Sequence, residues 1–194
     1  MTVYISSDLH FGHKKIREYC PQFRSRFSTI EEMDQALIAE WNSKVKPGDQ
    51  IYFLGDMCFY RTDSEVNSLL YALQGNIIWV KGNHDHSSTL KLARKIDRYT
   101  IKDVVEMRHS DNNLIVMTHF PQLIWNKNHY GSVHFHGHCH SSIEKHNADI
   151  RRTDCGWDVT GHIMTLEEAY AKTMKKPIKT VEGDHHNTER AKNL

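Results

Sequence analysis

The sequence predicts an α/β protein in which mixed β-sheets are covered by helices. In the first half of the chain, short apolar and β-branched runs at residues 3–6, 51–54 and 77–80 alternate with segments of helical pattern, which is typical of strands joined by helical crossovers. In the second half, the runs at 114–117 and 133–136 follow shorter connections, which favours a mixed sheet. The 194 residues, 39% of them hydrophobic and 25% charged, suffice for one domain with a substantial core.

Helix boundaries in the first half are predicted from capping residues. Ser28, followed three residues later by Glu31, has the pattern of a capping box for a helix over about 29–44. Asp63 is expected to cap a second helix that runs to about Leu73, because aspartate accepts a hydrogen bond from the first turn.

The second half is predicted to continue with a helix over Ser88–Lys95 and a strand over 101–107. Three short polar residues at 111–113 predict a hairpin turn between that strand and the next one. Thr165 and Glu168 form another capping box, which opens the last helix. We therefore expect a single domain over residues 1–176, followed by a polar tail over 177–194.

Composition limits the compartment and the partners. The formal net charge is +1, so overall charge gives no attraction to nucleic acid or to a membrane, although a local basic patch is compatible with it. No apolar run approaches the roughly 20 residues that span a bilayer, and the start MTVYISSDLH has no secretory pattern. The four cysteines are scattered, which predicts neither a disulfide framework nor a thiolate zinc site. A cytoplasmic protein is expected.

Histidine is the outlier of the composition, with 15 residues, and it recurs in the octet VHFHGHCH at 133–140. On a strand, alternate residues point to the same face, so the four imidazoles either line a polar surface or share a metal ion. From the octet alone, the two interpretations are equally good.

Metal-binding residue types follow each apolar run of the sequence. Since ligand sites of open α/β folds lie beyond the carboxyl ends of the strands, five segments are expected to deliver side chains to one edge. These side chains are Asp8 and His10, Asp56, Asn83 and His84, His119, and His138 and His140.

Charge balance predicts the chemistry of this edge. Two divalent ions carry four positive charges, and Asp8, Asp56 and a bridging hydroxide remove three of them, which favours an anionic substrate such as a phosphate ester. Oxygen and imidazole ligands without thiolate favour Mn²⁺, with Fe or Zn²⁺ as alternatives.

The motifs Asp8-Leu9-His10, Gly55-Asp56, Gly82-Asn83-His84-Asp85, His119 and Gly137-His138-Cys139-His140 resemble those of the calcineurin-like metallophosphoesterases in order and approximate spacing. The resemblance covers residues 3–140 and implies a four-layer αββα sandwich with mixed sheets and a dinuclear metal centre. It implies that one ion is held by Asp8, His10, Asp56 and His140, and the other by Asp56, Asn83, His119 and His138. His84 would contact the phosphate and protonate the leaving oxygen. The segments at 156–158 and 165–168 resemble the closing strand and final helix of small family members.

The sequence departs from this family pattern at Phe59. The fuller motif has an aspartate there, which orients the catalytic histidine, and phenylalanine accepts no hydrogen bond. Asp85, Asp63 or a backbone carbonyl are the candidate substitutes. Asp85 is therefore grouped with His84 as a catalytic candidate. Its alternative roles are to support a metal ligand or to cap the helix that follows.

Other candidates have two interpretations each. Gly137 is expected to let the backbone turn, so that His136 is left to a supporting or structural role and His134 to a structural one. Trp125 either stacks on a base or packs its loop, and Cys139 is expected to be an inert buried thiol. A basic cluster either holds phosphate or forms a solvated helix face, and it consists of Lys14, Lys15, Arg17, Arg24 and Arg26. The last candidates are the loop histidine His13 and, in the tail, His185 and His186.

These observations predict a metal-dependent phosphoesterase that hydrolyses a phosphodiester or phosphomonoester, for example a nucleotide or cyclic nucleotide, by attack of a metal-bridging hydroxide. The rival hypotheses are a nuclease and a non-catalytic scaffold of the same fold. The oligomeric state is not predicted.

Overall fold

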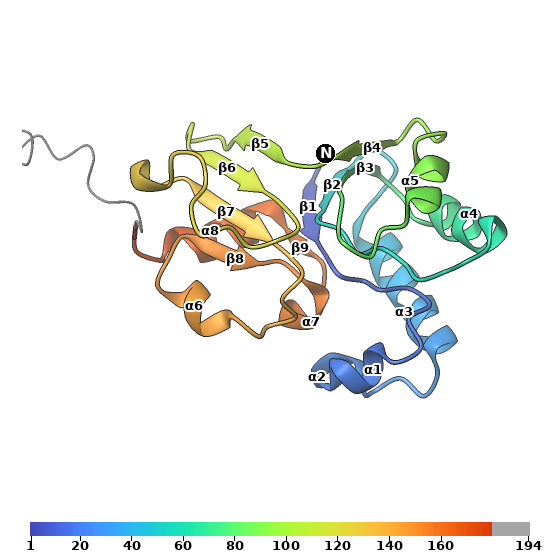
Figure 1. The fold of residues 1–194 in the computed structure, drawn as a ribbon. Helices are drawn as coiled ribbons and strands as arrows, with labels where there is room; N and C mark the ends of the chain where they lie inside the picture. The colour runs from blue at the N-terminus through green and yellow to red at the C-terminus, as the bar shows by residue number, and fades with distance from the viewer. Residues whose placement is uncertain (180–194) are drawn as a thin grey trace, which may run out of the picture.

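The computed structural model describes residues 1–179 and has two β-sheets at its centre (Figure 1). The first sheet has the strand order β4-β3-β2-β1-β9, and the second has the order β5-β6-β7-β8. The strands are β1 (Val3–Ser6), β2 (Gln50–Phe53), β3 (Asn76–Val80), β4 (Tyr99–Lys102), β5 (Val105–Arg108), β6 (Leu114–Met117), β7 (Val133–His136), β8 (Arg152–Asp154) and β9 (Met164–Thr165).

Both sheets are mixed, as predicted. In the first sheet, β1, β2, β3 and β4 run parallel and only β9 is antiparallel to its neighbour β1. In the second sheet, β5 is antiparallel to β6, whereas β6, β7 and β8 are parallel. The predicted hairpin turn at 111–113 joins β5 to β6.

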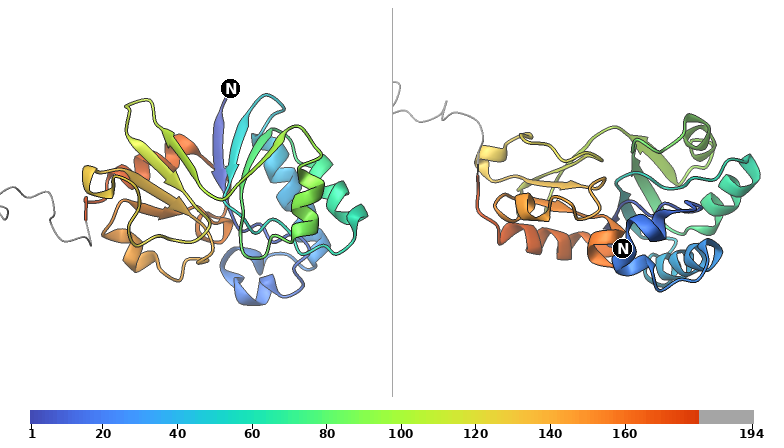
Figure 2. Two further views of the ribbon diagram at one scale, coloured as in Figure 1. Left: turned by 45° about the horizontal axis from the view of Figure 1, so that its top comes forward. Right: turned by 60° about the horizontal axis from the view of Figure 1, so that its bottom comes forward.

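Helices flank the two sheets, and the helix bounds are α1 (Ile16–Tyr19), α2 (Pro21–Arg24), α3 (Ile30–Lys44), α4 (Asp63–Ala72), α5 (Ser87–Ala93), η1 (Asn128–Tyr130), α6 (Glu144–Ala148), α7 (Trp157–Thr160) and α8 (Leu166–Met174). Helices α3, α4 and α5 cover the outer face of the first sheet (Figure 2). No helix among residues 1–179 is long and apolar enough to cross a membrane.

Two main hydrophobic clusters fill the space between the layers. Phe53 of β2 and Trp79 of β3 belong to the cluster between the first sheet and its helices, as expected for apolar runs, and Trp41 of α3 packs in the same cluster. Ile5 and Phe135 belong to the cluster between the facing sheets, which also includes the apolar face of α8. Burial of both faces explains why the strands read as continuous apolar runs rather than as an alternating pattern.

Two predicted caps are wrong by one residue. Thr29, not Ser28, caps α3, because its hydroxyl accepts a hydrogen bond from the Glu32 N–H at 3.1 Å. Thr62 caps α4 in a capping box with Glu65, so Asp63 is the first helical residue. In each case adjacent residues all have side chains that can cap, and the sequence pattern alone does not choose among them. The capping box of Thr165 and Glu168 is confirmed.

The single strand predicted over 101–107 is two strands in different sheets. β4 continues the first sheet next to β3, and β5 begins the second sheet next to β6. The chain passes between the sheets within two residues, Asp103 and Val104, so no gap in the β-type sequence marks the crossing. The predicted tail over 177–194, with His185 and His186, lies largely outside the described residues and stays a prediction.

Candidate metal centre

The predicted ligands converge because the loops after parallel strands run side by side. The Asp8 N–H donates to the Gly55 carbonyl at 3.0 Å, and the His10 N–H donates to the Asp56 carbonyl at 3.1 Å. These hydrogen bonds extend the alignment of β1 and β2 past the end of the sheet. They hold Asp8, His10 and Asp56 next to one another at the carboxyl ends of the strands.

Three groups of side chains in the described part of the chain have ligand atoms within 4.8 Å of one another. One of them, Cys20, His140 and Asp158, includes a single predicted ligand, whereas the other two consist entirely of predicted ligands. Of these two, the first consists of Asp8, His10 and His140, and the second consists of Asp56, His119 and His138. Asn83 joins the second group, because its Oδ1 lies 2.9 Å from the His119 Nε2. The structure therefore brings all seven predicted ligands together, in two sets that match the two ions of the prediction.

The Asp56 carboxylate belongs to the second group and also lies close to the first. Its Oδ2 is 3.8 Å from the His10 Nε2 in one group and 3.5 Å from the His119 Nε2 in the other. Its Oδ1 accepts a hydrogen bond from the His84 N–H at 2.8 Å, so one oxygen is fixed and the other faces both groups. This is the position that a carboxylate shared by two cations requires.

Burial without partners shows that these residues fit cations. Asp8 is 0% exposed and Asp56 is 1% exposed. The Asp8 Oδ1 and both ring nitrogens of His10 are buried and have no hydrogen-bond partner. Buried polar atoms without partners are costly, and two divalent ions would satisfy these atoms together. His138 and His140 are half-buried and Asn83 is exposed, so the centre is open to solvent on that side.

The pKa values favour the protonation states that bind metal. Burial lowers the pKa of His10 to about 4, so its ring is neutral at pH 7. Burial would raise the pKa of Asp8, but the nearby imidazole of His10, whose Nε2 lies 3.6 Å from the Asp8 Oδ1, holds it well below its usual range. For Asp56, burial and the charge of Asp8 raise the pKa to about 6, against the opposing effect of His119. A carboxylate and a neutral imidazole are the ligand forms.

His140 differs from the other histidines of the centre. Burial would lower its pKa, but hydrogen bonds to Asp158 and Cys20 outweigh burial and raise the pKa to about 11. A metal ion at this position therefore has to displace a proton, which makes its binding dependent on pH.

Five of the ligands have left-handed backbone conformations, which residues other than glycine rarely adopt. The φ values are 58° at Asp8, 54° at His10, 59° at Asp56, 69° at His138 and 45° at His140. Such strain costs about 1 kcal/mol or more for each residue, and it persists only where the surrounding structure enforces it. Such a concentration of strained residues is typical of functional sites.

Gly137 is needed for a different reason from the one predicted. The backbone turn is made by His138 and His140, and Gly137 itself does not have a positive φ. A Cβ atom at Gly137 would lie 2.0 Å from the Ser7 Oγ and 2.4 Å from the Asp8 Oδ2. Glycine therefore allows β7 to approach the end of β1, where the His138 N–H donates to the Asp8 Oδ2 at 2.9 Å.

Asp85 supports the loop that carries a ligand. Its carboxylate accepts four hydrogen bonds of 2.7–3.0 Å, from the backbone N–H groups of Asp56, Met57 and Gly82 and from the Trp79 indole. His86, not Asp85, is the N-cap residue of α5. Asp85 thus fixes the Asp56 loop against the loop after β3, and the helix-cap alternative is wrong.

The ring of His84 lies against aromatic neighbours at the exposed side of the centre. Its centroid is 5.0 Å from that of Phe59 and 5.9 Å from that of His10. Phe59, which replaces the aspartate of the family pattern, also stacks on His10 at 5.3 Å with an angle of 23° between the rings. Packing against Phe59 therefore restricts the ring of His84 at the place where the pattern has a carboxylate.

Arg24 and Asp158 form a buried ion pair that supports the candidate centre, a role that was not predicted from the sequence. Arg24 is fully buried, and its guanidinium binds both oxygens of Asp158, at 2.5 and 3.0 Å. It also donates to the backbone carbonyls of Asp8 and Leu9 at 2.7 and 2.9 Å. The Asp158 Oδ2 lies 2.7 Å from the His140 Nδ1. The prediction of a solvated helix face is therefore wrong for Arg24. Its partner is 134 residues away, and only the resemblance at 156–158 gave a signal.

The remaining candidates lie outside the two ligand groups. His134 is buried, with its Nδ1 3.1 Å from the Val116 carbonyl and its Nε2 accepting from the Gln122 N–H. His136 is also buried, with its Nδ1 2.7 Å from the Gly137 carbonyl. Thus the four histidines of the octet divide into two in the ligand groups and two in the interior. Trp125 is buried and packs its loop, and Cys139 is half-buried rather than fully buried.

Comparisons with known proteins show what the chain is similar to. The model of the family described as calcineurin-like phosphoesterase matches residues 1–190. The Gene 66 protein of Mycobacterium phage L5 is 25% identical over 196 aligned residues, which cover 86% of this chain and 91% of that protein.

Two further relatives come from an archaeon and a bacterium. The "Uncharacterized protein MJ1445" of Methanocaldococcus jannaschii is 40% identical over 84 residues, 43% of this chain, and the match spans less than half of that protein, 46% of its length. The crystal structure of the protein AQ665 from Aquifex aeolicus, described as of unknown function, has a TM-score of 0.64 and 22% identity, covering 86% of this chain and 96% of that one. The last similarity supports the fold alone.

Replacing Asp56 by Asn is expected to weaken both metal positions together. The substitution removes the negative charge that faces both groups while it keeps the size of the side chain. Metal content per chain after dialysis, measured by inductively coupled plasma mass spectrometry, should fall from about two ions to below one. Asp97→Asn, at an exposed position, is the charge-matched control. Loss of only one ion in the Asp56→Asn variant would contradict a shared carboxylate.

Replacing Asp158 by Asn is expected to act through His140 and Arg24. Loss of this charge leaves Arg24 buried without its ion-pair partner, so the free energy of unfolding should fall by about 3 kcal/mol in urea denaturation. Metal affinity should fall roughly 10–100-fold, because the carboxylate no longer orients the imidazole. Asp149→Asn, exposed on the surface, should change neither quantity. Unaltered affinity in the Asp158→Asn variant would show that Asp158 does not act on the ligand.

Proposed function

Because the chain belongs to the calcineurin-like phosphoesterase family, we propose that it is a dinuclear metal-dependent hydrolase of phosphodiesters or phosphomonoesters. The observation that carries this proposal is the pair of ligand groups that meet at Asp56. A structural site would be closed and four-coordinate, usually with cysteine. This centre instead is open to solvent at Asn83, His84 and the half-buried histidines.

Two divalent ions fit the donor set. One ion would be held by Asp8, His10, Asp56 and His140, and the other by Asp56, Asn83, His119 and His138. When bound, the ion pair would supply a hydroxide nucleophile and the positive charge that the phosphoryl oxygens need. Oxygen and imidazole donors without thiolate support Mn²⁺ as the native metal, with Fe or Zn²⁺ as alternatives.

His84 is proposed to protonate the leaving oxygen of the ester. It is exposed beside the ligand groups and is not a member of either. Its backbone N–H is tied to the Asp56 Oδ1 and its ring packs on Phe59, so the imidazole is positioned at the open side of the centre. Asp85 is proposed as a positioning residue, because its hydrogen bonds fix the loop that joins Gly82 to His84 against the Asp56 loop.

The catalytic unit is proposed to be one domain over residues 1–176 that works in the cytoplasm. Asp8 near the start of the chain and Asp158 near the end of the described part support the same centre, so the site needs both sheets. All four cysteines are free, which is compatible with a reducing compartment.

Hydrolysis of bis(p-nitrophenyl) phosphate and p-nitrophenyl phosphate tests the function. The purified protein loaded with Mn²⁺ should release p-nitrophenol from at least one of them, and EDTA should abolish the release until Mn²⁺ is restored. Fully metal-loaded protein that turns over no ester in a panel including cyclic nucleotides and short nucleic acids would favour the non-catalytic scaffold. Preference for the nucleic acids would favour the nuclease.

Replacing His84 by Ala should lower turnover roughly 10²–10⁴-fold, the usual contribution of a general acid. Metal content should stay near that of the wild type, because His84 is not proposed as a ligand. Steady-state kinetics and metal analysis of the same preparation measure both quantities, with the exposed His146→Ala variant as the control. Loss of metal together with activity would show that His84 is a ligand instead.

A further inference from the structure

A pocket of about 480 Å³ lies next to the candidate metal centre, and we call it the basic–aromatic pocket. It is lined, apart from Gly12, by His13, Lys14, Lys15, Tyr19, Phe59 and Arg61. Its volume falls within the range of about 300–1,000 Å³ that is common for small-ligand sites. The proposed hydrolysis assigns no role to these side chains, apart from the contact of Phe59 with His84.

The basic–aromatic pocket is continuous with the centre through Phe59. The ring of Phe59 contacts the rings of His10 and His84, with distances between ring centroids of 5.3 and 5.0 Å. His13 packs edge-on against Phe59 at 4.2 Å, and Tyr19 follows at 6.0 Å from His13. A row of rings thus leads from the metal ligands outward. A substrate with its reacting phosphorus at the centre would place its next group along this row.

Positive charge accompanies the row of rings. Lys14, Lys15 and Arg61 are exposed, and the described residues that line the pocket include no carboxylate. The Arg61 Nη1 lies 2.6 Å from the His86 Nε2, so the guanidinium is held in place. Cations without an acidic partner in the same pocket favour an anionic ligand, and a fixed guanidinium suits a phosphate.

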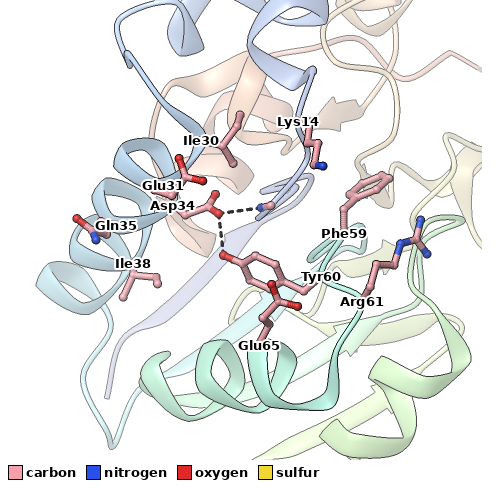
Figure 3. A pocket seen from close by; sticks show the side chains of 11 residues that line it. Lys14, Ile30, Glu31, Asp34, Gln35, Ile38, Phe59, Tyr60, Arg61 and Glu65 are labelled. Carbon is pink, nitrogen blue, oxygen red and sulfur yellow. Dashed lines mark hydrogen bonds between the residues drawn. The ribbon is translucent and has the colours of Figure 1, made fainter.

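The neighbouring hollow shows on which side an anion would be accepted. This hollow, of about 710 Å³, shares Lys14, Phe59 and Arg61 with the basic–aromatic pocket. In Figure 3 these three side chains lie on one side and Glu31 and Asp34 lie on the other, whereas Glu65 lies next to Tyr60. An anion is therefore expected on the side of the basic–aromatic pocket and not in the hollow beyond it.

The aromatic surface indicates the second half of the ligand. Tyr19 is 65% exposed, although a large ring normally gains by being covered. Exposed rings beside cations are the usual platform for a base and its phosphates, because every base has a face that stacks. The replacement of the family aspartate by Phe59 adds to this platform at the point closest to the centre.

We propose that the basic–aromatic pocket binds the base and a non-reacting phosphate of a small nucleotide that carries at least two phosphate groups. Phe59 and Tyr19 would contact the base, and Lys14, Lys15 and Arg61 would bind the non-reacting phosphate. This inference rests on the proposed function, because the reacting phosphate would lie at the metal centre. The bounded volume favours one nucleotide over a nucleic acid strand.

Calorimetric titration of the Mn²⁺-loaded full chain tests this proposal with three probes. The probes are α,β-methylene-ADP, methylenebisphosphonate, which has the same metal-binding group without a nucleoside, and AMP, which lacks the second phosphate. We expect α,β-methylene-ADP to bind at least tenfold more tightly than either of the others. A protein that hydrolyses no ester would refute the proposed function but would leave this comparison of affinities readable, so the two failures are distinguishable.

Two substitutions separate the roles within the basic–aromatic pocket. Phe59→Leu should reduce the advantage of α,β-methylene-ADP over methylenebisphosphonate at least fivefold, and Phe59→Trp should retain it. Lys14→Ala should reduce the advantage of α,β-methylene-ADP over AMP at least threefold. Lys91→Ala, an exposed lysine on α5, is the matched control and should leave all three affinities unchanged.

Three results would overturn the inference. Equal affinity for α,β-methylene-ADP and methylenebisphosphonate would show that no nucleoside is bound. An equal loss of affinity for these two probes in Phe59→Leu would show that Phe59 acts only through His10. Binding of a single-stranded hexathymidylate more than tenfold tighter than α,β-methylene-ADP would assign the surface to nucleic acid.

Discussion

The structure depends on two carboxylates that are buried among imidazoles. Asp8 and Asp56 are almost completely removed from water, and the closest nitrogens of His10 and His119 are too far away to form good hydrogen bonds with them. One oxygen of each carboxylate accepts a backbone hydrogen bond, but removing the negative charge from water remains expensive. Two bound cations would offset this cost and would also create the proposed reactive site. Under the proposed function, stability and activity would therefore have the same origin in this chain.

Two sets of hydrogen bonds hold the candidate ligands in place. Arg24 is buried and donates hydrogen bonds to the Asp8 carbonyl and to Asp158, and Asp158 in turn contacts the His140 ring. Asp85 gathers backbone N–H groups from two loops. The left-handed residues could not keep their conformation without these bonds. Because rigid supports position the side chains before substrate arrives, little reorganisation remains for the reaction itself.

The sequence predicted the parts that follow from local pattern. Apolar runs located the strands, and the polar residues after them located the ligands, because parallel strands end at one edge. It failed where geometry joins distant residues. Neither the ion pair of Arg24 and Asp158 nor the four bonds of Asp85 has a fixed spacing. It also misjudged Gly137, because a steric contact with Asp8 is not visible in a one-dimensional pattern.

The order of the strands has a consequence for synthesis on the ribosome. β1 (Val3–Ser6) lies between β2 and β9, although β9 (Met164–Thr165) is translated long after β1. Until Met164 and Thr165 leave the exit tunnel, one edge of β1 lacks its partner, and Asp158 has emerged only shortly before. A nascent chain thus carries an incomplete first sheet and an unformed centre until β9 has emerged, and the proposed metal ions could be captured in the final geometry only after that point.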